Sequence, residues 1–407
     1  MPLRPPAGFI SAFYDPLNNP NAPTIGTATA GAASASVAFT APTNVGGSAI
    51  SSYSAISTPE AIIASAASSP ITVLGLTNGT AYTFAVWATN TYGPSAYSAS
   101  SGSVTPFNPS RGVFAGGYTT GFNNTNVIQY ITIESTGNST DFGDLTTNIA
   151  FYNMACSSST RGIFAGGFSG GSTYSNVINY VTIATAGNAT DFGDLLNTVS
   201  YQGGGCSNST RGLFIGRDGT VDGLASPSIQ YITIASTGNG INFGDLTGNT
   251  SYGAAAANTT RAIFARGNGS STTNYVTIAS TGNATNFGNM TITRNDGTAG
   301  CSSATRALFV GTTNSSNGNV IDYCTIATTG SFADFGDLVT PLQACAATSN
   351  STRGVFAGGY STTGGGTGIL SGITYVTMAS TGNSTSFGDL VTPAYGIAGC
   401  SSAHGGL

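Results

Sequence analysis

The chain has 407 residues, of which 40% are hydrophobic and only 6% are charged. This length allows two or three domains with cores of ordinary size, and their polar surface has to be built from Ser, Thr, Asn and Gly. The ten basic residues are all Arg and the formal net charge is −5, so the chain lacks the basic cluster that nucleic acid or an anionic membrane surface would require.

The first 20 residues are expected to form a Pro-rich arm. Pro pairs and polar residues interrupt the continuous apolar run that a signal peptide needs. No later stretch approaches the roughly 18 apolar residues of a membrane-spanning helix. The sequence therefore predicts neither standard export nor membrane insertion. It predicts instead that another chain covers four apolar residues of the arm and so anchors the protein: Phe9, Ile10, Phe13 and Tyr14.

Residues 21–106 lack the repeat that fills the rest of the chain. The segments SVAFTAP (36–42) and LTNGTAYTFAVWATNTYGPS (76–95) carry a resemblance to fibronectin type III domains. The resemblance implies a tyrosine corner at Tyr82 and a buried aromatic residue at Phe39. It implies no chemistry.

Residues 107–407 contain one pattern six times. Its most regular marker is an Arg that opens an apolar strand, at intervals of 45 to 50 residues, which is typical of solenoids and propellers. The marker residues are Arg111, Arg161, Arg211, Arg261, Arg306 and Arg353.

Each repeat predicts four short strands. The second repeat reads TRGIFAGG (160–167), a variable loop, VINYVTI (177–183), a turn, and DFGDL (191–195), and YNMACSSS (152–159) adds a strand before it. The residues are β-branched or aromatic and are separated by Gly-Asn turns, which favours strands. Four strands per repeat predict a propeller blade.

The diglycine that ends the second strand, followed by a tyrosine strand and an aromatic strand, resembles the kelch and galactose-oxidase-like propellers. The chain departs from that pattern because Phe replaces Trp in the fourth strand and the diglycine is incomplete in three repeats. The resemblance implies an all-β protein in which a six-bladed propeller follows the sandwich. The first repeat begins at its second strand and the chain ends with a first strand, so strand 395–402 is expected to pair with strand 111–118 and close the ring.

Cysteines occupy one register of the repeat at Cys156, Cys206, Cys301 and Cys400. Equivalent positions of different blades lie too far apart for a disulfide, so we expect free thiols that pack as small hydrophobic groups. Cys324 and Cys345 lie outside this register.

The repeated Arg and the Asp pairs of the aromatic strand are expected to be structural. We predict that each Arg pairs with a nearby carboxylate and that the Asp residues also cap turns. Calcium binding and acid–base catalysis are the alternatives. The Asp residues concerned include Asp141, Asp144, Asp191 and Asp194, whereas the fourth repeat has Asn286 and Asn289.

Catalysis requires titratable groups, and the chain has one His and no Lys. His404 lies close to the C-terminus and is expected to be exposed. We therefore predict a protein without catalytic residues, metal or cofactor.

The two faces of the predicted ring differ. Connections between strands 1 and 2 and between strands 3 and 4 are nearly constant, whereas those between strands 2 and 3 and between strands 4 and 1 vary widely. Repeat proteins place binding surfaces in such variable loops, although loops also vary where nothing constrains them. The candidate binding residues are Tyr118, Phe122, Asn123, Asn124, Tyr174, Arg217, Asp218, Asp222, Tyr360 and Thr362.

A chain without Lys that joins a Pro-rich arm, a fibronectin-like module and kelch-like repeats resembles virion structural proteins of tailed bacteriophages, including those that infect cyanobacteria. The resemblance implies a tail or fibre component that assembles in the host cytoplasm, is held by its arm, is oligomeric in the particle, and displays the propeller for host attachment or decoration. Its partners would be other virion proteins and a host surface glycan. A secreted cell-surface adhesin that binds carbohydrate and a glycan-hydrolysing propeller that uses the Asp pairs are the alternatives.

Overall fold

The computed structural model describes residues 17–121, 123–147, 153–168, 174–199, 203–216, 226–312, 318–361 and 368–407. Regular structure in these residues consists of β-strands alone. Nowhere in them is there a helix of the length and apolar character that crossing a bilayer requires. The chain divides into two compact units, Met1–Pro109 and Ser110–Leu407. The all-β class predicted from the sequence is confirmed.

The first unit is a sandwich of two antiparallel sheets, one of three strands and one of four. Both sheets alternate between buried and exposed side chains, and their inward faces share one core that includes Val37, Ala55 and Val86. The three-stranded sheet has the order β1 (Thr24–Gly31), β2 (Ser34–Thr40) and β5 (Ile71–Leu74), and the four-stranded sheet has the order β4 (Ile63–Ala66), β3 (Ser52–Thr58), β6 (Thr83–Asn90) and β7 (Gly93–Pro94).

Tyr82 lies just before β6 and is completely buried in this core. Its hydroxyl accepts a hydrogen bond from the main-chain N–H of Thr77 at 2.9 Å and donates one to Glu60. This hydroxyl therefore ties the loop before β6 to the body of the sandwich, which is the geometry of a tyrosine corner. Phe39 is also buried and packs against Tyr53, with 4.7 Å between the ring centroids.

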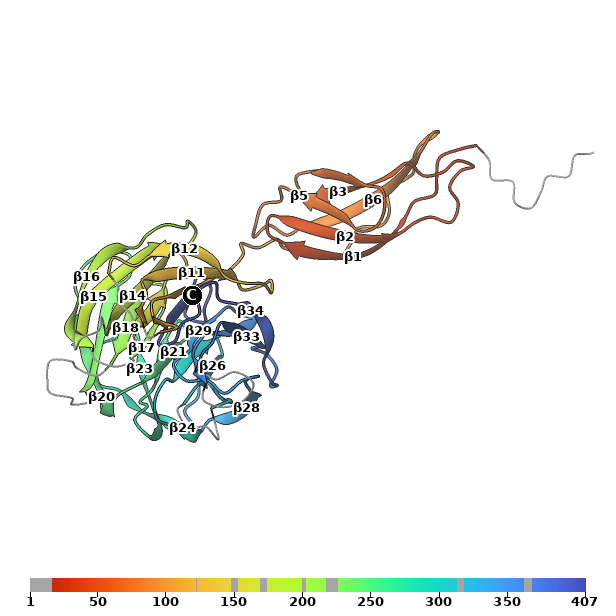
Figure 1. Ribbon diagram of the computed structural model, residues 1–407. Coiled ribbons are helices and arrows are strands. Elements are labelled where there is room, and N and C mark those ends of the chain that lie inside the picture. The colour runs from red at the N-terminus through yellow and green to blue at the C-terminus, as the bar shows by residue number, and fades with distance from the viewer. Residues whose placement is uncertain are drawn as a thin grey trace, which may run out of the picture. The chain divides into compact units, whose positions relative to one another are not determined.

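The second unit contains six four-stranded antiparallel sheets in its described residues, arranged around a common centre (Figure 1). Two small hairpins are formed by β9 (Tyr118–Thr119) with β10 (Asn123–Asn124) and by β31 (Tyr360–Ser361) with β32 (Gly368–Ile369). In order of pairing, the six sheets are β35 (Ala398–Ser401), β8 (Arg111–Ala115), β11 (Val127–Thr132) and β12 (Thr140–Asp144); β13 (Met154–Ser157), β14 (Arg161–Phe168), β15 (Tyr174–Thr182) and β16 (Thr190–Val199); β17 (Gly204–Ser207), β18 (Arg211–Ile215), β19 (Ser226–Thr233) and β20 (Ile241–Thr250); β21 (Ala254–Ala257), β22 (Arg261–Ala265), β23 (Ser270–Thr277) and β24 (Thr285–Arg294); β25 (Ala299–Ser302), β26 (Arg306–Val310), β27 (Val320–Thr325) and β28 (Ala333–Asp337); and β29 (Ala346–Ser349), β30 (Arg353–Ala357), β33 (Gly372–Thr377) and β34 (Thr385–Asp389).

The first strands of the six sheets contact one another in cyclic order: β35, β13, β17, β21, β25, β29 and again β35. The sheet that starts and ends the unit is completed by both ends of the chain. Cys400 pairs with Val113 and Ser401 with Gly112, and a further bridge joins Tyr118 to Tyr395. The pairing of the terminal strands predicted from the sequence is thus confirmed.

Main-chain hydrogen bonds join each fourth strand to the next sheet. The carbonyls of Phe142 and Asp144 in β12 accept the N–H groups of Gly187 and Ala189, both at 2.7 Å, and the same pair of bonds recurs around the unit. Gly143 is required at this crossing because it has a φ of 146° and a Cβ there would lie 2.5 Å from the carbonyl carbon of Gly187. The repeated Phe-Gly and Gly-Asn motifs are therefore two sides of one contact.

The repeated Arg also joins neighbouring sheets, but its partner differs from the one predicted. Arg161 donates to the carbonyls of Ile234 and Ala235 in the next sheet, each at 3.0 Å. Each guanidinium lies over the Tyr of its own third strand, at 4.4 to 5.2 Å from the ring centroid, and that Tyr meets the Phe of the fourth strand edge to face. The carbonyl acceptors of Arg111, Arg161, Arg211, Arg261, Arg306 and Arg353 belong to Ile183, Ile234, Ile278, Ile326, Met378 and Ile133.

The predicted Arg–Asp pairing is wrong, because no repeated Arg forms an ion pair with a carboxylate of the described residues. Asp141 and Asp191 are exposed, and Asp144 and Asp194 contribute their main chain to the contact between sheets. The N–H of Asp144 donates to Asn188 Oδ1 at 3.0 Å. Since the main chain makes the contact, Asn289 replaces Asp without loss: its carbonyl accepts the N–H of Phe332 at 2.8 Å.

The described residues contain one ion pair, between Arg294 and Asp322. The distance between Nη2 and Oδ2 is 2.7 Å, and both side chains are fully buried. Arg294 also donates to the carbonyls of Phe309, Gly311 and Val320. Asp322 accepts the N–H of Thr291 at 2.9 Å, a role that Asn179 and Asn274 fill in other repeats. The desolvated charges are thus compensated by several hydrogen bonds.

Deletion of residues 394–407 should destabilise the whole second unit. The deletion removes β35, so apolar side chains that pack against this strand become exposed and two strand edges lose their partner. We therefore expect the free energy of unfolding in urea to fall by at least about 4 kcal/mol. Deletion of residues 402–407 alone, which keeps β35, should cost clearly less. Equal unfolding curves for the intact and the longer-deleted protein would contradict the closure of the unit by its terminal strands.

Replacement of Arg211 by Gln should lower the free energy of unfolding by about 2 kcal/mol, because it removes two charge-assisted hydrogen bonds and the cation–π contact with Tyr231. Asp191→Asn is the matched control and should change it by less than about 0.5 kcal/mol. If both substitutions cost the same, the carboxylate contributes to the contact after all.

Candidate functional site

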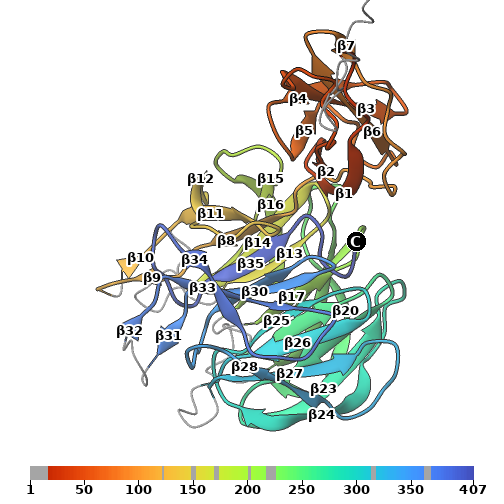
Figure 2. The same ribbon diagram turned by 90° about the vertical axis from the view of Figure 1, so that its right-hand side faces the viewer.

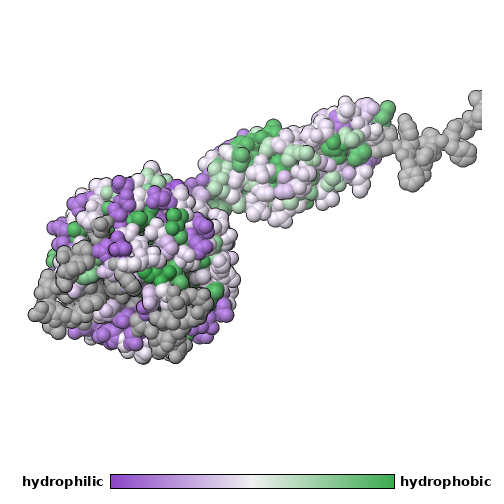
Figure 3. Space-filling model, viewed as in Figure 1, coloured by the Kyte–Doolittle hydropathy of each residue, from purple (hydrophilic) through white to green (hydrophobic). Residues whose placement is uncertain are grey.

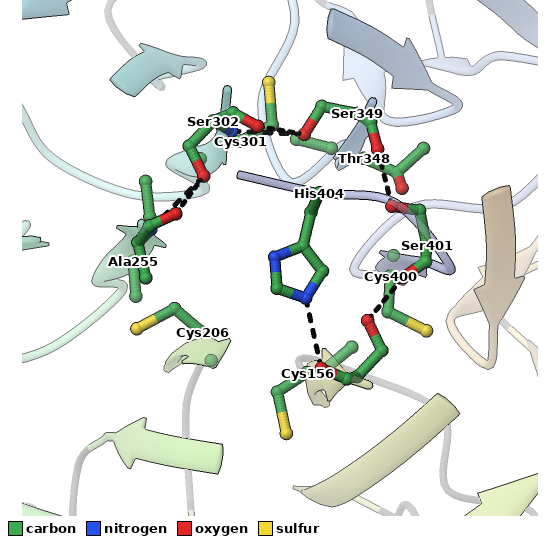
Figure 4. Close-up of a pocket in the computed structure, with 18 of the residues that line it drawn as sticks. Cys156, Cys206, Ala255, Cys301, Ser302, Thr348, Ser349, Cys400, Ser401 and His404 are labelled. Carbon is green, nitrogen blue, oxygen red and sulfur yellow. Dashed lines mark hydrogen bonds between the residues drawn. The ribbon is translucent and has the colours of Figure 1, made fainter. Parts of the chain in front are cut away.

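The first strands surround a narrow channel whose wall carries a ring of serines (Figure 4). Ser207 Oγ donates to the carbonyl of Ser157, and Ser157 Oγ donates to the carbonyl of Ser401, each at 2.7 Å. The same bond recurs from Ser401, Ser349 and Ser302, and Ala257 occupies the sixth position. The hydroxyls thus stabilise the ring itself. The channel cavity measures about 40 Å³, enough for a few water molecules and too small for a sugar or a cofactor.

His404 lies inside this ring, which corrects the expectation of an exposed tail residue. Its Nε2 lies 3.1 Å from the carbonyl of Ser157 and 3.2 Å from Ser207 Oγ, and its Nδ1 accepts the N–H of Gly406 at 3.0 Å. A carbonyl only accepts, so Nε2 carries the hydrogen and the imidazole is neutral. Burial lowers the pKa of His404 to about 4, against the opposing effect of the Ser157 carbonyl.

The two glycines after His404 are the feature of the sequence from which its position in the channel could have been predicted. A Cβ on Gly405 would lie 2.1 Å from the carbonyl oxygen of Ser303, and a Cβ on Gly406 would lie 1.8 Å from that of Ser207. Two consecutive residues without a side chain therefore allow the C-terminal segment to enter the channel.

All six cysteines are free and buried, as predicted for the four that share one register of the repeat. Burial raises the pKa of Cys301 and of Cys400 to about 12, so these thiols stay protonated near neutral pH and are poor nucleophiles. Cys156 packs against the next sheet, where a Cβ on Gly212 would lie 2.4 Å from its sulfur. This contact explains why position 212 has no side chain.

The described residues contain no group of three or more His, Cys, Asp or Glu that could hold a metal ion. The exposed Asp141 and Asp191 lie on separate outer strands, β12 and β16.

The variable loops carry aromatic clusters instead. Tyr118 in β9 and Tyr360 in β31 both lie against Tyr395, with 5.7 and 5.5 Å between ring centroids. Tyr174 packs against Phe168 at 5.4 Å. Asn123 and Asn124 form β10 beside Tyr118. The candidates Phe122, Arg217, Asp218, Asp222 and Thr362 lie outside the described residues, as do the anchoring candidates Phe9, Ile10, Phe13 and Tyr14.

Tyr395 is a residue that sequence reasoning missed. It lies in the connection from strand 4 to strand 1, whereas Tyr118 and Tyr360 lie in connections from strand 2 to strand 3. Their contact brings both kinds of variable loop together on one face. The sequence does contain a signal for this residue, because a Tyr recurs just before the first strand in other repeats, at Tyr152, Tyr201 and Tyr252.

The visible surface is mostly pale in Figure 3, with hydrophobic and hydrophilic residues in small patches. No protein-family model matches the chain, and no curated protein matches it.

Acid should destabilise the second unit through His404. The imidazole has a pKa of about 4 in the fold and about 6.5 in the unfolded chain, so the unfolded state takes up the proton first. The stabilisation is complete above about pH 6.5 and is lost as the pH falls to about 4, at up to about 1.4 kcal/mol per pH unit.

Urea unfolding of the wild type and of His404→Gln between pH 4 and 8 measures this loss, because the carboxylates contribute equally to both proteins. The difference in the free energy of unfolding should shrink as the pH falls. Parallel pH profiles would mean that the folded protein accommodates the imidazolium.

Proposed function

We propose that the second unit is a six-bladed β-propeller of the kelch type and that the first is a fibronectin type III-like module. The cyclic contacts of six first strands and the pairing of the terminal strands support the propeller. The intact diglycines support the kelch type: Gly116 and Gly117 have φ angles of 72° and 100°, which other residues rarely adopt. The hydroxyl of Tyr82 supports the fibronectin-like module.

We propose further that the chain is a non-enzymatic virion protein of a phage tail or fibre, which displays its propeller for host attachment or decoration. The observation that carries the proposal is the contrast between the two faces. The constant motifs form the contacts between blades, as Arg161 does with the carbonyl of Ile234. The variable loops instead bring tyrosine side chains into contact with one another. Variation that is confined to one face of a rigid scaffold is typical of binding proteins.

The chemistry of the described residues supports a binding role over catalysis. His404 is neutral and engaged with main-chain groups, and the thiol of Cys301 is buried and protonated. Binding to an uncharged glycan needs only hydroxyls, amides and aromatic rings, which the loops provide.

Attachment to the particle is assigned to the arm of residues 1–20. Burying Phe9, Ile10, Phe13 and Tyr14 against other virion proteins would be worth roughly 1.5–3 kcal/mol for each side chain, enough to hold a subunit after the cost of ordering the arm.

Two variants with reciprocal phenotypes test the proposal in phage particles. Deletion of residues 1–16, which keeps the contacts of Asn18 with Gly46 and Asn90, should abolish incorporation and leave the melting temperature of the purified chain unchanged. Replacement of residues 219–225 and 362–367 by Gly-Ser segments should leave incorporation unchanged and reduce adsorption to host cells at least about tenfold. Immunoblots of purified particles and adsorption rates are the measurements.

Adsorption that stays unchanged both with the loop replacements and with Tyr360→Ala would leave decoration as the role of the propeller. Binding of the purified chain to bacterial surfaces, together with its absence from particles, would favour the secreted adhesin.

A further inference from the structure

Three tyrosines from separate segments form one aromatic cluster, here called the tyrosine platform: Tyr118, Tyr360 and Tyr395. The ring of Tyr395 contacts both of the others and is tilted by 40° to Tyr118 and by 53° to Tyr360. All three side chains are half-buried, so each keeps part of its surface accessible. The hairpins that carry Tyr118 and Tyr360, β9–β10 and β31–β32, lie side by side at the edge of the unit in Figure 2.

The platform is held by main-chain hydrogen bonds. Tyr118 and Tyr395 exchange two N–H to carbonyl bonds, of 2.8 and 3.0 Å. Tyr360 exchanges two such bonds with Gln343, of 2.9 and 3.0 Å. The backbone of each tyrosine is therefore fixed before any ligand arrives, which lowers the entropy cost of binding.

The diglycine of the repeat makes this close approach possible. A Cβ on Gly117 would lie 2.8 Å from the carbonyl oxygen of Tyr395, and a Cβ on Gly359 would lie 3.0 Å from that of Gln343. The residues that follow the two diglycines, Tyr118 and Tyr360, are thus brought against the connection from strand 4 to strand 1.

Amide side chains stand next to two of the three rings. Asn124 is the partner of Tyr118 in the β9–β10 hairpin, and Gln343 is the partner of Tyr360 in an antiparallel bridge. Residues that face each other across an antiparallel pair project from the same side of the sheet. Each of these rings therefore has an amide, which both donates and accepts hydrogen bonds, as its neighbour.

We infer that the tyrosine platform binds a sugar ring of a neutral glycan. Aromatic faces cover the C–H surface of a pyranose, while tyrosine hydroxyls and the amides of Asn124 and Gln343 match its hydroxyl groups. The inference rests on the proposed role in attachment and names the class of ligand and the place where it binds.

The hydroxyls of Tyr395 and Tyr118 carry no charge near neutral pH. Burial, with smaller contributions from Tyr118 and Tyr360, raises the pKa of Tyr395 to about 12. Burial also raises the pKa of Tyr118. Both hydroxyls are therefore uncharged donors throughout the physiological range of pH.

The test uses the purified full chain on a printed array of neutral and acidic oligosaccharides, and on host cells before and after periodate oxidation of their surface sugars. Tyr360→Ala should weaken binding to the neutral glycans about tenfold or more. Tyr395→Phe keeps the ring and should weaken binding less than Tyr395→Ala. Tyr97→Ala, which removes an exposed aromatic residue of the first unit, should leave binding unchanged. Melting temperatures establish that the variants are folded.

Loss of glycan binding in the folded platform variants, with retention in Tyr97→Ala, supports the platform. Glycan binding that persists in all tyrosine variants overturns the platform and leaves the proposed attachment role intact. Cell binding that depends on the tyrosines but survives periodate overturns the sugar in favour of a protein partner. If the wild type binds neither the array nor host cells, the platform and the attachment role fall together.

Discussion

Each sheet of the second unit leaves main-chain groups on its outer strand that only the next sheet satisfies. The carbonyls of Phe142 and Asp144 would have no protein partner without the turn that contains Gly187 and Ala189. Because an unpaired main-chain group in a packed interface is costly, the sheets stabilise one another only as a complete cycle. The closing strand β35 and the bond from Arg353 to the carbonyl of Ile133 complete that cycle.

This constraint explains how a chain with 6% charged residues is held together. The contacts between sheets use carbonyls, hydroxyls, amides and Arg guanidinium groups stacked on tyrosine, so they need hardly any carboxylate–cation pairs. Even the channel follows this rule, since the hydroxyl of Ser207 bonds to the neighbouring strand and His404 enters as a neutral ring. The constant face is occupied by these bonds, which leaves the other face free to vary.

The cycle tolerates local exceptions where another group supplies the same bond. Ala257 interrupts the serine ring, and Asn289 replaces Asp because its carbonyl makes the contact. At Asp322 a carboxylate replaces the usual amide, and the fully buried Arg294 compensates the charge. Removal of either partner would leave a buried charge unpaired, so the two residues depend on each other.

The sequence by itself determined the features that depend on local alternation and on the period. It was sufficient for the all-β class, for the strands of each repeat, for the pairing of strand 395–402 with strand 111–118, and for the free buried thiols. These follow from side-chain spacing within some tens of residues. Only the tertiary structure decided the partner of Arg161, the position of His404 in the channel, and the meeting of Tyr118, Tyr360 and Tyr395. Each of these depends on how far neighbouring sheets are rotated and how closely their backbones approach when the cycle closes, and a repeat motif read along one strand contains neither quantity.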